Sequence, residues 1–328
     1  MNIGVVGTGR LGSLHARMLS SLETVRLAGI HDADTEKARA LGGELGVPVF
    51  STLGELLDCT EALTIATDTT SHAEVARAAL GRGKHVFIEK PLAGTVAEAE
   101  EICSLARAGG LILQVGHIER FNPAILALEG RNLRPLFVES HRLSMFNPRG
   151  TDVAVVLDLM IHDIDIILSL VKAPVTRVDA SGVAVVSDTV DIANARLQFA
   201  GGCVANVTAS RISQKKMRKM RLFQKEEYIS VDFLAPSAEV FRLCGAEEEP
   251  PPGALALGAI GSGTAARKVL YERPVVREVN ALRHELALFV QSVREGTPPV
   301  VSGEDGLRAL EVAHAIMEKI ARQEIGSP

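Results

Sequence analysis

The sequence predicts an α/β protein with a doubly wound parallel sheet in its N-terminal part and mostly antiparallel strands in its C-terminal part. In the N-terminal part, short apolar segments alternate with segments of helical spacing, which favours a parallel sheet with helices on both faces. Beyond about residue 120 this alternation weakens, and closely spaced strand segments follow. We therefore expect two domains, residues 1–120 and residues 121–328.

Each N-terminal element has its own sequence signal. Residues 2–6 form a short apolar run that ends at Gly7, which is typical of a buried strand. Thr95 followed by Glu98 is a capping-box pattern, which predicts the start of a helix. The same reasoning predicts strands at 2–6, 25–30, 62–66, 85–88 and 111–115, and helices at 11–20, within 31–46, at 72–80 and at 95–108.

The C-terminal part begins with an apolar helix at residues 155–170. Residues 194–210 predict two antiparallel strands, because Gly201–Gly202 between them can form a hairpin turn. A second strand pair is expected around Arg221 and Ile229. Residues 245–266 predict a loop by composition, and residues 280–294 and 306–322 predict amphipathic helices.

Composition excludes several classes of function. Hydrophobic residues make up 47% and charged residues 23%, as in ordinary globular proteins. The net charge of −5 gives no reason to expect nucleic-acid binding. No apolar run has transmembrane length, and the first strand begins at residue 2, so we expect a cytoplasmic protein without signal peptide or membrane partner. Four scattered cysteines are expected to be reduced thiols: Cys59, Cys103, Cys203 and Cys244.

The turn after the first strand has the pattern G-x-G-x-x-G at residues 7–12. Alone the pattern is weak, but here it follows a strand and opens a helix, as in the Rossmann dinucleotide fold. Gly7 permits the tight turn, Gly9 lets the backbone approach a pyrophosphate, and Gly12 allows close helix–strand packing. The helix N-terminus offers N–H groups to the anion. The alternative is a tight turn that binds no ligand.

Asp32 lies twenty residues after Gly12, at the end of the second strand. A carboxylate there accepts hydrogen bonds from both ribose hydroxyls of NAD and repels a 2′-phosphate. We therefore expect NAD, with NADP less favoured, although Lys37 and Arg39 are close in sequence. Asp32 could instead be a turn or cap residue, but Asp34 is the better candidate for a helix cap.

The helix at residues 155–170 carries a narrow polar stripe on an otherwise apolar surface. Asp158, His162, Asp165 and Ser169 fall within about 60° of one another on an ideal helix. Such a stripe suits proton transfer, because imidazole titrates near neutrality and a carboxylate, Asp158 or Asp165, can hold its tautomer. An ordinary solvent-facing side is the alternative. A metal site is less favoured, because the stripe has one histidine.

These pieces together resemble the Gfo/Idh/MocA family of NAD(P)-dependent oxidoreductases. The resemblance covers most of the chain and depends on GVVGTGRLGSLHA, IATDTTSHAEVARAAL, HVFIEKPLA and the D-x-x-x-H-x-x-D helix. It implies a C-terminal domain with a mostly antiparallel open sheet that binds substrate and packs in a homodimer or homotetramer. It also implies that Lys90, Asp158 and His162 form the active site, although Lys90 alone would suit a surface charge. Thr67-Asp68 replaces the family's usual Thr-Pro.

The motifs and the resemblance together give the candidate residues. The cofactor set is Gly7, Gly9, Arg10, Leu11, Gly12, Asp32, Thr67, His72, Glu89 and Lys90. The substrate set is Lys90, His117, Arg120, Asn122, Asp158, His162, Asp165 and Arg211, and no metal is expected.

A narrower resemblance, to the UDP-N-acetylglucosamine 3-dehydrogenase branch, rests on QVGHIERFNPAI and on SRISQKKMRKMRLFQKEEYISVDF. Basic residues between Arg211 and Arg221 could meet a nucleotide-sugar diphosphate, or form a solvated edge between strands. The implied reaction is hydride transfer between a secondary alcohol of a sugar or nucleotide sugar and NAD. A polyol such as inositol as substrate, NAD-assisted glycoside hydrolysis and non-catalytic NAD sensing are the alternatives.

Overall fold

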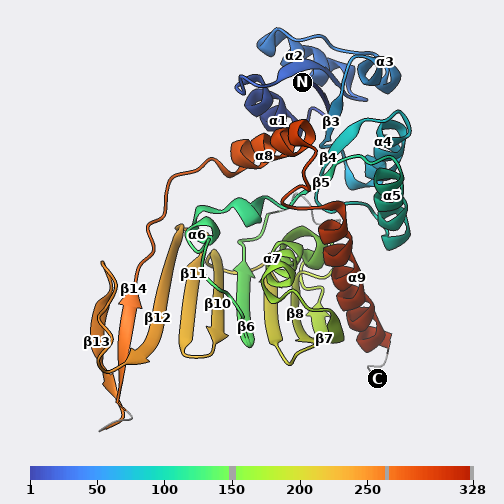
Figure 1. The fold of residues 1–328 in the computed structure, drawn as a ribbon. Coiled ribbons are helices and arrows are strands. Elements are labelled where there is room, and N and C mark those ends of the chain that lie inside the picture. Colours follow the sequence, from blue (N-terminus) through green and yellow to red (C-terminus); the bar gives the residue numbers. More distant parts are fainter. Residues whose placement is uncertain (148–152, 263–265, 326–328) are drawn as a thin grey trace. The chain divides into compact units, whose positions relative to one another are not determined.

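The computed structural model describes residues 1–147, 153–262 and 266–325 (Figure 1). The chain divides into two compact units. The first consists of Met1–Ile118 and Asn280–Glu311, and the second of Glu119–Val279 and the residues from Val312 onward. That residues 1–120 and 121–328 are two separate domains stays a prediction. Residues 280–311, which follow the C-terminal strands in sequence, belong to the first unit.

The first unit is built on a five-stranded parallel sheet with the order β2-β1-β3-β4-β5, as the α/β prediction requires. Strand β1 pairs in parallel with both β2 and β3, so the strand order reverses beside it. In such sheets ligands bind beyond the carboxyl ends of the strands near this point. The strands are β1 (Asn2–Val6), β2 (Arg26–His31), β3 (Ala62–Ile65), β4 (His85–Glu89) and β5 (Leu113–Gly116).

Helices cover this sheet, and side-chain caps fix where several of them begin. Thr95 and Glu98 form the predicted capping box, and Asp34 accepts a hydrogen bond from the Lys37 amide as the predicted cap. Phe87 of β4 packs edge-on against Phe289 of the helix at Ala281–Glu295 (α8), at 5.7 Å between ring centroids. The helices are α1 (Arg10–Ser20), α2 (Thr35–Leu45), α3 (Leu53–Asp58), α4 (Thr69–Gly81), α5 (Val96–Ala108) and α8 (Ala281–Glu295).

The second unit contains a nine-stranded sheet with the order β13-β14-β12-β11-β10-β6-β9-β8-β7 (Figure 1). Strands β6 and β9 are parallel, and the other neighbours are antiparallel, which confirms the mostly antiparallel sheet. Gly201 and Gly202 have φ angles of 94° and 91° in the predicted turn. The strands are β6 (Phe137–Leu143), β7 (Val175–Val183), β8 (Ile192–Phe199), β9 (Val204–Ser210), β10 (Met217–Gln224), β11 (Glu227–Asp232), β12 (Ser237–Gly245), β13 (Leu255–Ile260) and β14 (Arg267–Glu272).

The predicted loop at residues 245–266 is wrong in part. Residues 255–260 form β13, which pairs with β14 at the edge of the sheet although every side chain of β13 is exposed. Backbone hydrogen bonds hold this edge strand, so it forms although its apolar side chains are not buried. Residues 263–265 of the predicted loop lie outside the described residues.

The predicted apolar helix departs from one uniform α-helix in its first turn. Residues Val156–Met160 form a π-helical turn (η2), and α7 (Ile161–Val171) continues from it. A π turn widens the helix and changes the angle between Asp158 and the residues after it, and such turns are frequent at functional sites. Helix α7 packs against β6 and β9. The remaining helices are η1 (Ile118–Phe121), α6 (Pro123–Leu126) and α9 (Gly303–Ile325).

Candidate active site

The glycine-rich turn has the geometry that its three glycines predict. Gly7 has a φ of +87°, and a Cβ there would lie 2.6 Å from the Ala66 carbonyl oxygen. A Cβ on Gly12 would lie 1.8 Å from the Gly7 oxygen, so only glycine allows α1 to pack this closely on β1. Gly9 is different, because no protein atom lies within 4 Å of its Cβ position. The space beside Gly9 therefore remains open for a ligand.

A pocket of about 370 Å³ lies beside this turn. Gly7, Gly9, Asp32 and Thr67 of the predicted cofactor set line it, which fits the pyrophosphate and ribose of a dinucleotide. Arg10 and Leu11, also predicted, begin α1 and are exposed. The wall has further residues that the sequence analysis did not select: His31, Lys37, Leu53, Ser71, Glu74 and Val75. The spacing of the last three on α4 is that of one helix face, which could have indicated them.

Asp32 is fixed at the pocket wall as an ionised carboxylate. Its Oδ2 accepts hydrogen bonds from the Thr8 amide at 2.5 Å and the Thr8 hydroxyl at 2.8 Å, and its Oδ1 accepts one from the Asp34 amide at 2.8 Å. Partial burial opposes ionisation, but these bonds outweigh it and lower the pKa of Asp32. A fixed negative charge at this place favours a ribose hydroxyl over a 2′-phosphate.

Three other predicted cofactor residues lie around the end of β4. Glu89 is the last residue of β4 and is buried, whereas Lys90 directly after it is half-buried. His72 of α4 is only 1% exposed. Its ring nitrogens face two backbone carbonyls, at 2.9 Å from Pro91 and 3.2 Å from Thr67. His72 thus contacts the protein backbone, and a role next to the cofactor stays a prediction.

In the second unit, Asp163 of α7 forms a buried ion pair with Arg142, the next-to-last residue of β6. Arg142 is 2% exposed and donates to both Asp163 oxygens, at 2.8 and 3.0 Å. It also donates to Glu119 at 2.8 Å. Burial opposes the charge on Arg142, but the two carboxylates outweigh this and raise its pKa. Asp163, which lay off the predicted stripe, therefore anchors α7 to the sheet.

Asp165 also anchors α7, through an ion pair with Arg120. It is 1% exposed and accepts two hydrogen bonds of 2.7 Å from Arg120. Asn122 caps α6 through the Ala124 amide and donates to Glu119 and to the Phe233 carbonyl. Arg120, Asn122 and Asp165, all predicted to bind substrate, thus make structural hydrogen bonds within the second unit.

Asp158 and His162 remain as the candidate chemical pair on this helix. Asp158 lies in the π turn, His162 lies in the first turn of α7, and both are half-buried. The neighbouring carboxylates at positions 163 and 165 are engaged by arginines. Asp165 is thus engaged by Arg120, and a role of Asp158 toward His162 stays a prediction.

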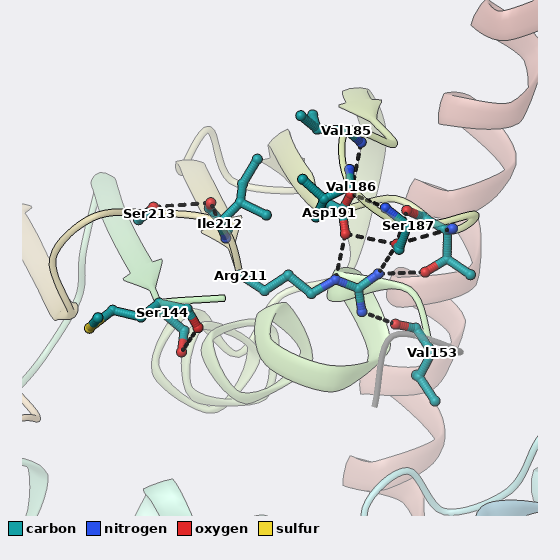
Figure 2. Close-up of polar contacts among 12 residues, drawn as sticks. Ser144, Val153, Val185, Val186, Ser187, Asp191, Arg211, Ile212 and Ser213 are labelled. Carbon is teal, nitrogen blue, oxygen red and sulfur yellow. Dashed lines mark hydrogen bonds and ion pairs between the residues drawn. The ribbon is translucent and has the colours of Figure 1, made fainter. Parts of the chain in front are cut away.

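Arg211 lies in a dense polar cluster of the second unit (Figure 2). Its guanidinium donates to Asp191 at 2.7 Å, to Ser187 at 2.9 Å and to the Val153 carbonyl at 2.6 Å. Asp191 is fully buried and accepts further bonds from the amides of residues 185–187. Burial opposes its ionisation, but these hydrogen bonds hold the pKa of Asp191 well below its ordinary value. The cluster ties β9 to the loop before β8, which indicates a structural role for Arg211.

Two further residues of the predicted basic run pair with acids on the same sheet. Arg221 faces Glu139 at 3.4 Å, and Lys219 faces Asp232 at 3.3 Å. Lys215 and Lys216 lie exposed between β9 and β10. His117, the remaining predicted substrate residue, is fully buried in the first unit. A search of residues 1–147, 153–262 and 266–325 for metal-binding groups of three or more His, Cys, Asp or Glu finds none.

Comparison with known proteins shows to which family the chain belongs. Residues 1–117 match the model of an oxidoreductase family with an NAD-binding Rossmann fold, and residues 125–229 match the GFO/IDH/MocA C-terminal domain. A UDP-N-acetylglucosamine 3-dehydrogenase of Acidithiobacillus ferrooxidans is 34% identical over 95% of each chain. The chain belongs to the Gfo/Idh/MocA oxidoreductase family.

Other relatives in the family support the same assignment. The solved structure of the Acidithiobacillus ferrooxidans UDP-N-acetylglucosamine 3-dehydrogenase superposes with a TM-score of 0.87, at 32% identity over 98% of both chains. A myo-inositol 2-dehydrogenase of Thermotoga maritima is 26% identical over 98% of this chain and 96% of its own length. As a Gfo/Idh/MocA protein, the chain is an NAD-dependent oxidoreductase. None of the helices in its described parts is long and apolar enough to cross a membrane.

Proposed function

We propose that this chain oxidises the C3 hydroxyl of UDP-N-acetylglucosamine with NAD as hydride acceptor. The main support is the 34% identity, over 95% of each chain, to an enzyme of that name. An inositol or other free polyol is the second candidate, supported by the more distant myo-inositol 2-dehydrogenase. The Asp32 carboxylate favours NAD over NADP in either case.

The proposed chemistry assigns one step to each candidate residue. His162 takes the hydroxyl proton on its imidazole, and Asp158 orients that ring. The Lys90 ammonium stabilises the alkoxide as the proton leaves. When bound beside Gly9 and Asp32, NAD supplies the hydride-accepting chemistry.

A comparison of three substrates tests the assignment. Purified protein is given NAD with UDP-N-acetylglucosamine, with N-acetylglucosamine or with myo-inositol, and NADH formation is followed. We expect kcat/KM to be at least roughly 100-fold higher with the nucleotide sugar, because binding energy from the remote diphosphate lowers the barrier at the reacting carbon. A preference for myo-inositol would favour the second candidate, a free polyol as substrate. Sugar cleavage without net NADH would indicate a hydrolase, and NAD binding without any turnover would indicate a sensor.

We also propose that the face of the second unit's sheet opposite α7 binds a second copy of the chain. Arg142 of β6 points toward α7, so Phe137, five residues earlier, points to the opposite face. From Phe137 a ladder of rings runs across β6, β10, β11, β12 and β14, with centroids 5.0 to 5.8 Å apart. The ladder consists of Phe137, Phe223, Tyr228, Phe241 and Tyr271.

This aromatic ladder has the composition of an interface core. The chain has only 10 Phe and 2 Tyr, yet five of these rings lie here without full burial. Flanking charges such as Arg221 and Glu139 are already paired within the chain, so a second copy that covers them would bury no unpaired charge. Large partly exposed aromatic patches are typical of protein contacts. We therefore propose that the chain forms a homodimer or homotetramer through this aromatic ladder, and that it does so in the cytoplasm.

Analytical ultracentrifugation of Tyr228→Glu tests the interface. We expect this variant to sediment as a monomer, because a carboxylate in the centre of the ladder would be buried without a partner. Val275→Glu is the matched control, since Val275 is 83% exposed and lies outside the ladder. A wild-type chain that is monomeric at micromolar concentration, or a Tyr228→Glu variant with unchanged assembly, contradicts the proposal.

A further inference from the structure

We propose that two buried histidines, His15 and His72, hold the backbone on both sides of Lys90 and so position its ammonium group. They are positioning residues and do not touch substrate themselves. The inference rests on the proposed role of Lys90 in stabilising the alkoxide. It concerns the first unit alone, where all of these residues lie.

His15 holds the residue before Lys90. It lies on α1, three residues beyond Gly12, and is fully buried. Its Nε2 lies 2.8 Å from Oε1 of Glu89, and Oε2 of Glu89 accepts a hydrogen bond from the Lys90 amide at 3.3 Å. Nδ1 of His15 has no hydrogen-bond partner among the described residues, so Nε2 carries the donated proton.

The surroundings of Glu89 are shaped for its carboxylate. A Cβ on Gly116, at the end of β5, would lie 3.0 Å from the carboxylate carbon and one oxygen of Glu89. Glycine at this position therefore leaves the room that the Glu89 side chain occupies. A buried carboxylate is costly without hydrogen-bond donors, and His15 supplies one. The Glu89 side chain is thus held in one place, and with it the amide of Lys90.

His72 holds the residue after Lys90. Nδ1 of His72 lies 2.9 Å from the Pro91 carbonyl oxygen, whereas Nε2 lies 3.2 Å from that of Thr67. Burial lowers the pKa of His72 more than the two carbonyls raise it, so the ring is neutral at pH 7 and has one N–H. The shorter contact identifies Nδ1 as the donor. Nε2 then carries no proton and does not donate to the Thr67 carbonyl oxygen.

Holding both neighbours matters because lysine is a poorly defined group by itself. Its ammonium sits on a flexible four-carbon stem, so the position and direction of its Cα help to determine where the ammonium lies. A misplacement of about 1 Å at a reacting centre costs on the order of 100-fold in rate. Helices α1 and α4 each supply one buried hydrogen bond to the two residues that flank Lys90. The backbone at Lys90 is therefore held on both sides.

Paired isosteric variants separate this role from simple filling of the core. Asparagine can place an amide donor where His72 has Nδ1, and glutamine can place one where His15 has Nε2. The variants are therefore His72→Asn and His15→Gln, each compared with the opposite amide, His72→Gln and His15→Asn. His85→Ala is the control for loss of a hydrogen-bonded histidine, because His85 bonds the Ile112 amide at the other end of β4.

Two readouts are measured on NAD-saturated protein. The first is kcat and KM with UDP-N-acetylglucosamine. The second is the NMR shift of Lys90 after reductive methylation with ¹³C-formaldehyde, which does not depend on knowing the substrate. If no sugar is oxidised, the proposed function fails, and the NMR shift still tests the two histidines.

We expect His72→Asn and His15→Gln to retain most of the wild-type kcat and the wild-type Lys90 shift. The opposite amides are expected to lower kcat by roughly 10- to 100-fold with KM and NAD affinity little changed, and to move the Lys90 shift. His85→Ala is expected to lower thermal stability alone. Equal behaviour of Asn and Gln at each site, or an unmoved Lys90 shift in all variants, overturns the proposal.

Discussion

Replacing Asp163 by alanine is expected to destabilise the second unit strongly. The carboxylate of Asp163 accepts two hydrogen bonds from Arg142, and both side chains are almost fully buried. Without Asp163, the Arg142 charge remains buried with Glu119 as its principal acid. Breaking a buried pair by removing one partner costs about 3–5 kcal/mol, and because Glu119 still compensates part of the Arg142 charge, the lower end of this range applies. We expect a loss of this size in the free energy of unfolding.

The matched control removes the same type of charge from an exposed pair. Asp179 pairs with Arg177 on β7, where the side chains are 47% and 64% exposed. Exposed pairs contribute about 0–1 kcal/mol, so Asp179→Ala should have little effect. Urea unfolding is followed by far-UV circular dichroism, because the chain has no tryptophan. An Asp163→Ala variant that loses no more stability than Asp179→Ala would refute the reasoning.

Three further predictions concern charge and titration. Asp32→Ala is expected to lower the NAD/NADP ratio of kcat/KM by about 10-fold or more, since it removes the carboxylate that repels a 2′-phosphate; an unchanged ratio counts against the Asp32 assignment. The folded-state pKa of Asp191 is depressed, so its stabilising effect is present above the unfolded pKa of about 3.9 and is lost as pH falls below it. Asp191→Asn should therefore flatten the acid side of a Tm-against-pH curve, and an unaltered slope would contradict this. Burial raises the pKa of Cys103 to about 12. Iodoacetamide at pH 8 should therefore label exposed Cys59 and spare Cys103, which peptide mass spectrometry can measure. Equal labelling of the two cysteines would contradict the burial of Cys103.

The sequence was sufficient wherever the signal is local. Gly7, Gly9 and Gly12 each meet the steric condition that their spacing predicts, and the Thr95–Glu98 box starts α5 as expected. The parallel sheet followed from the alternation of strands and helices. These features depend on residues only a few positions apart, so no knowledge of tertiary contacts was needed.

The sequence was insufficient where a residue's role depends on a distant partner. Asp165 belonged to the predicted polar stripe and Asp163 lay off it, but they pair with Arg120 and Arg142, 45 and 21 residues away. Arg142 lies at a buried position of an alternating strand, where an apolar residue would be the usual choice. Strand β13 was missed for a related reason, because backbone pairing with β14 forms it without burial.

The proposed chemistry depends most directly on a proton acceptor at residue 162. Single-turnover formation of NADH by His162→Asn, measured by stopped flow with saturating NAD and UDP-N-acetylglucosamine, tests it. The account predicts a rate lower by about 100- to 10,000-fold, the usual contribution of a general base, with NAD affinity unchanged. A rate within a few-fold of wild type would contradict the account.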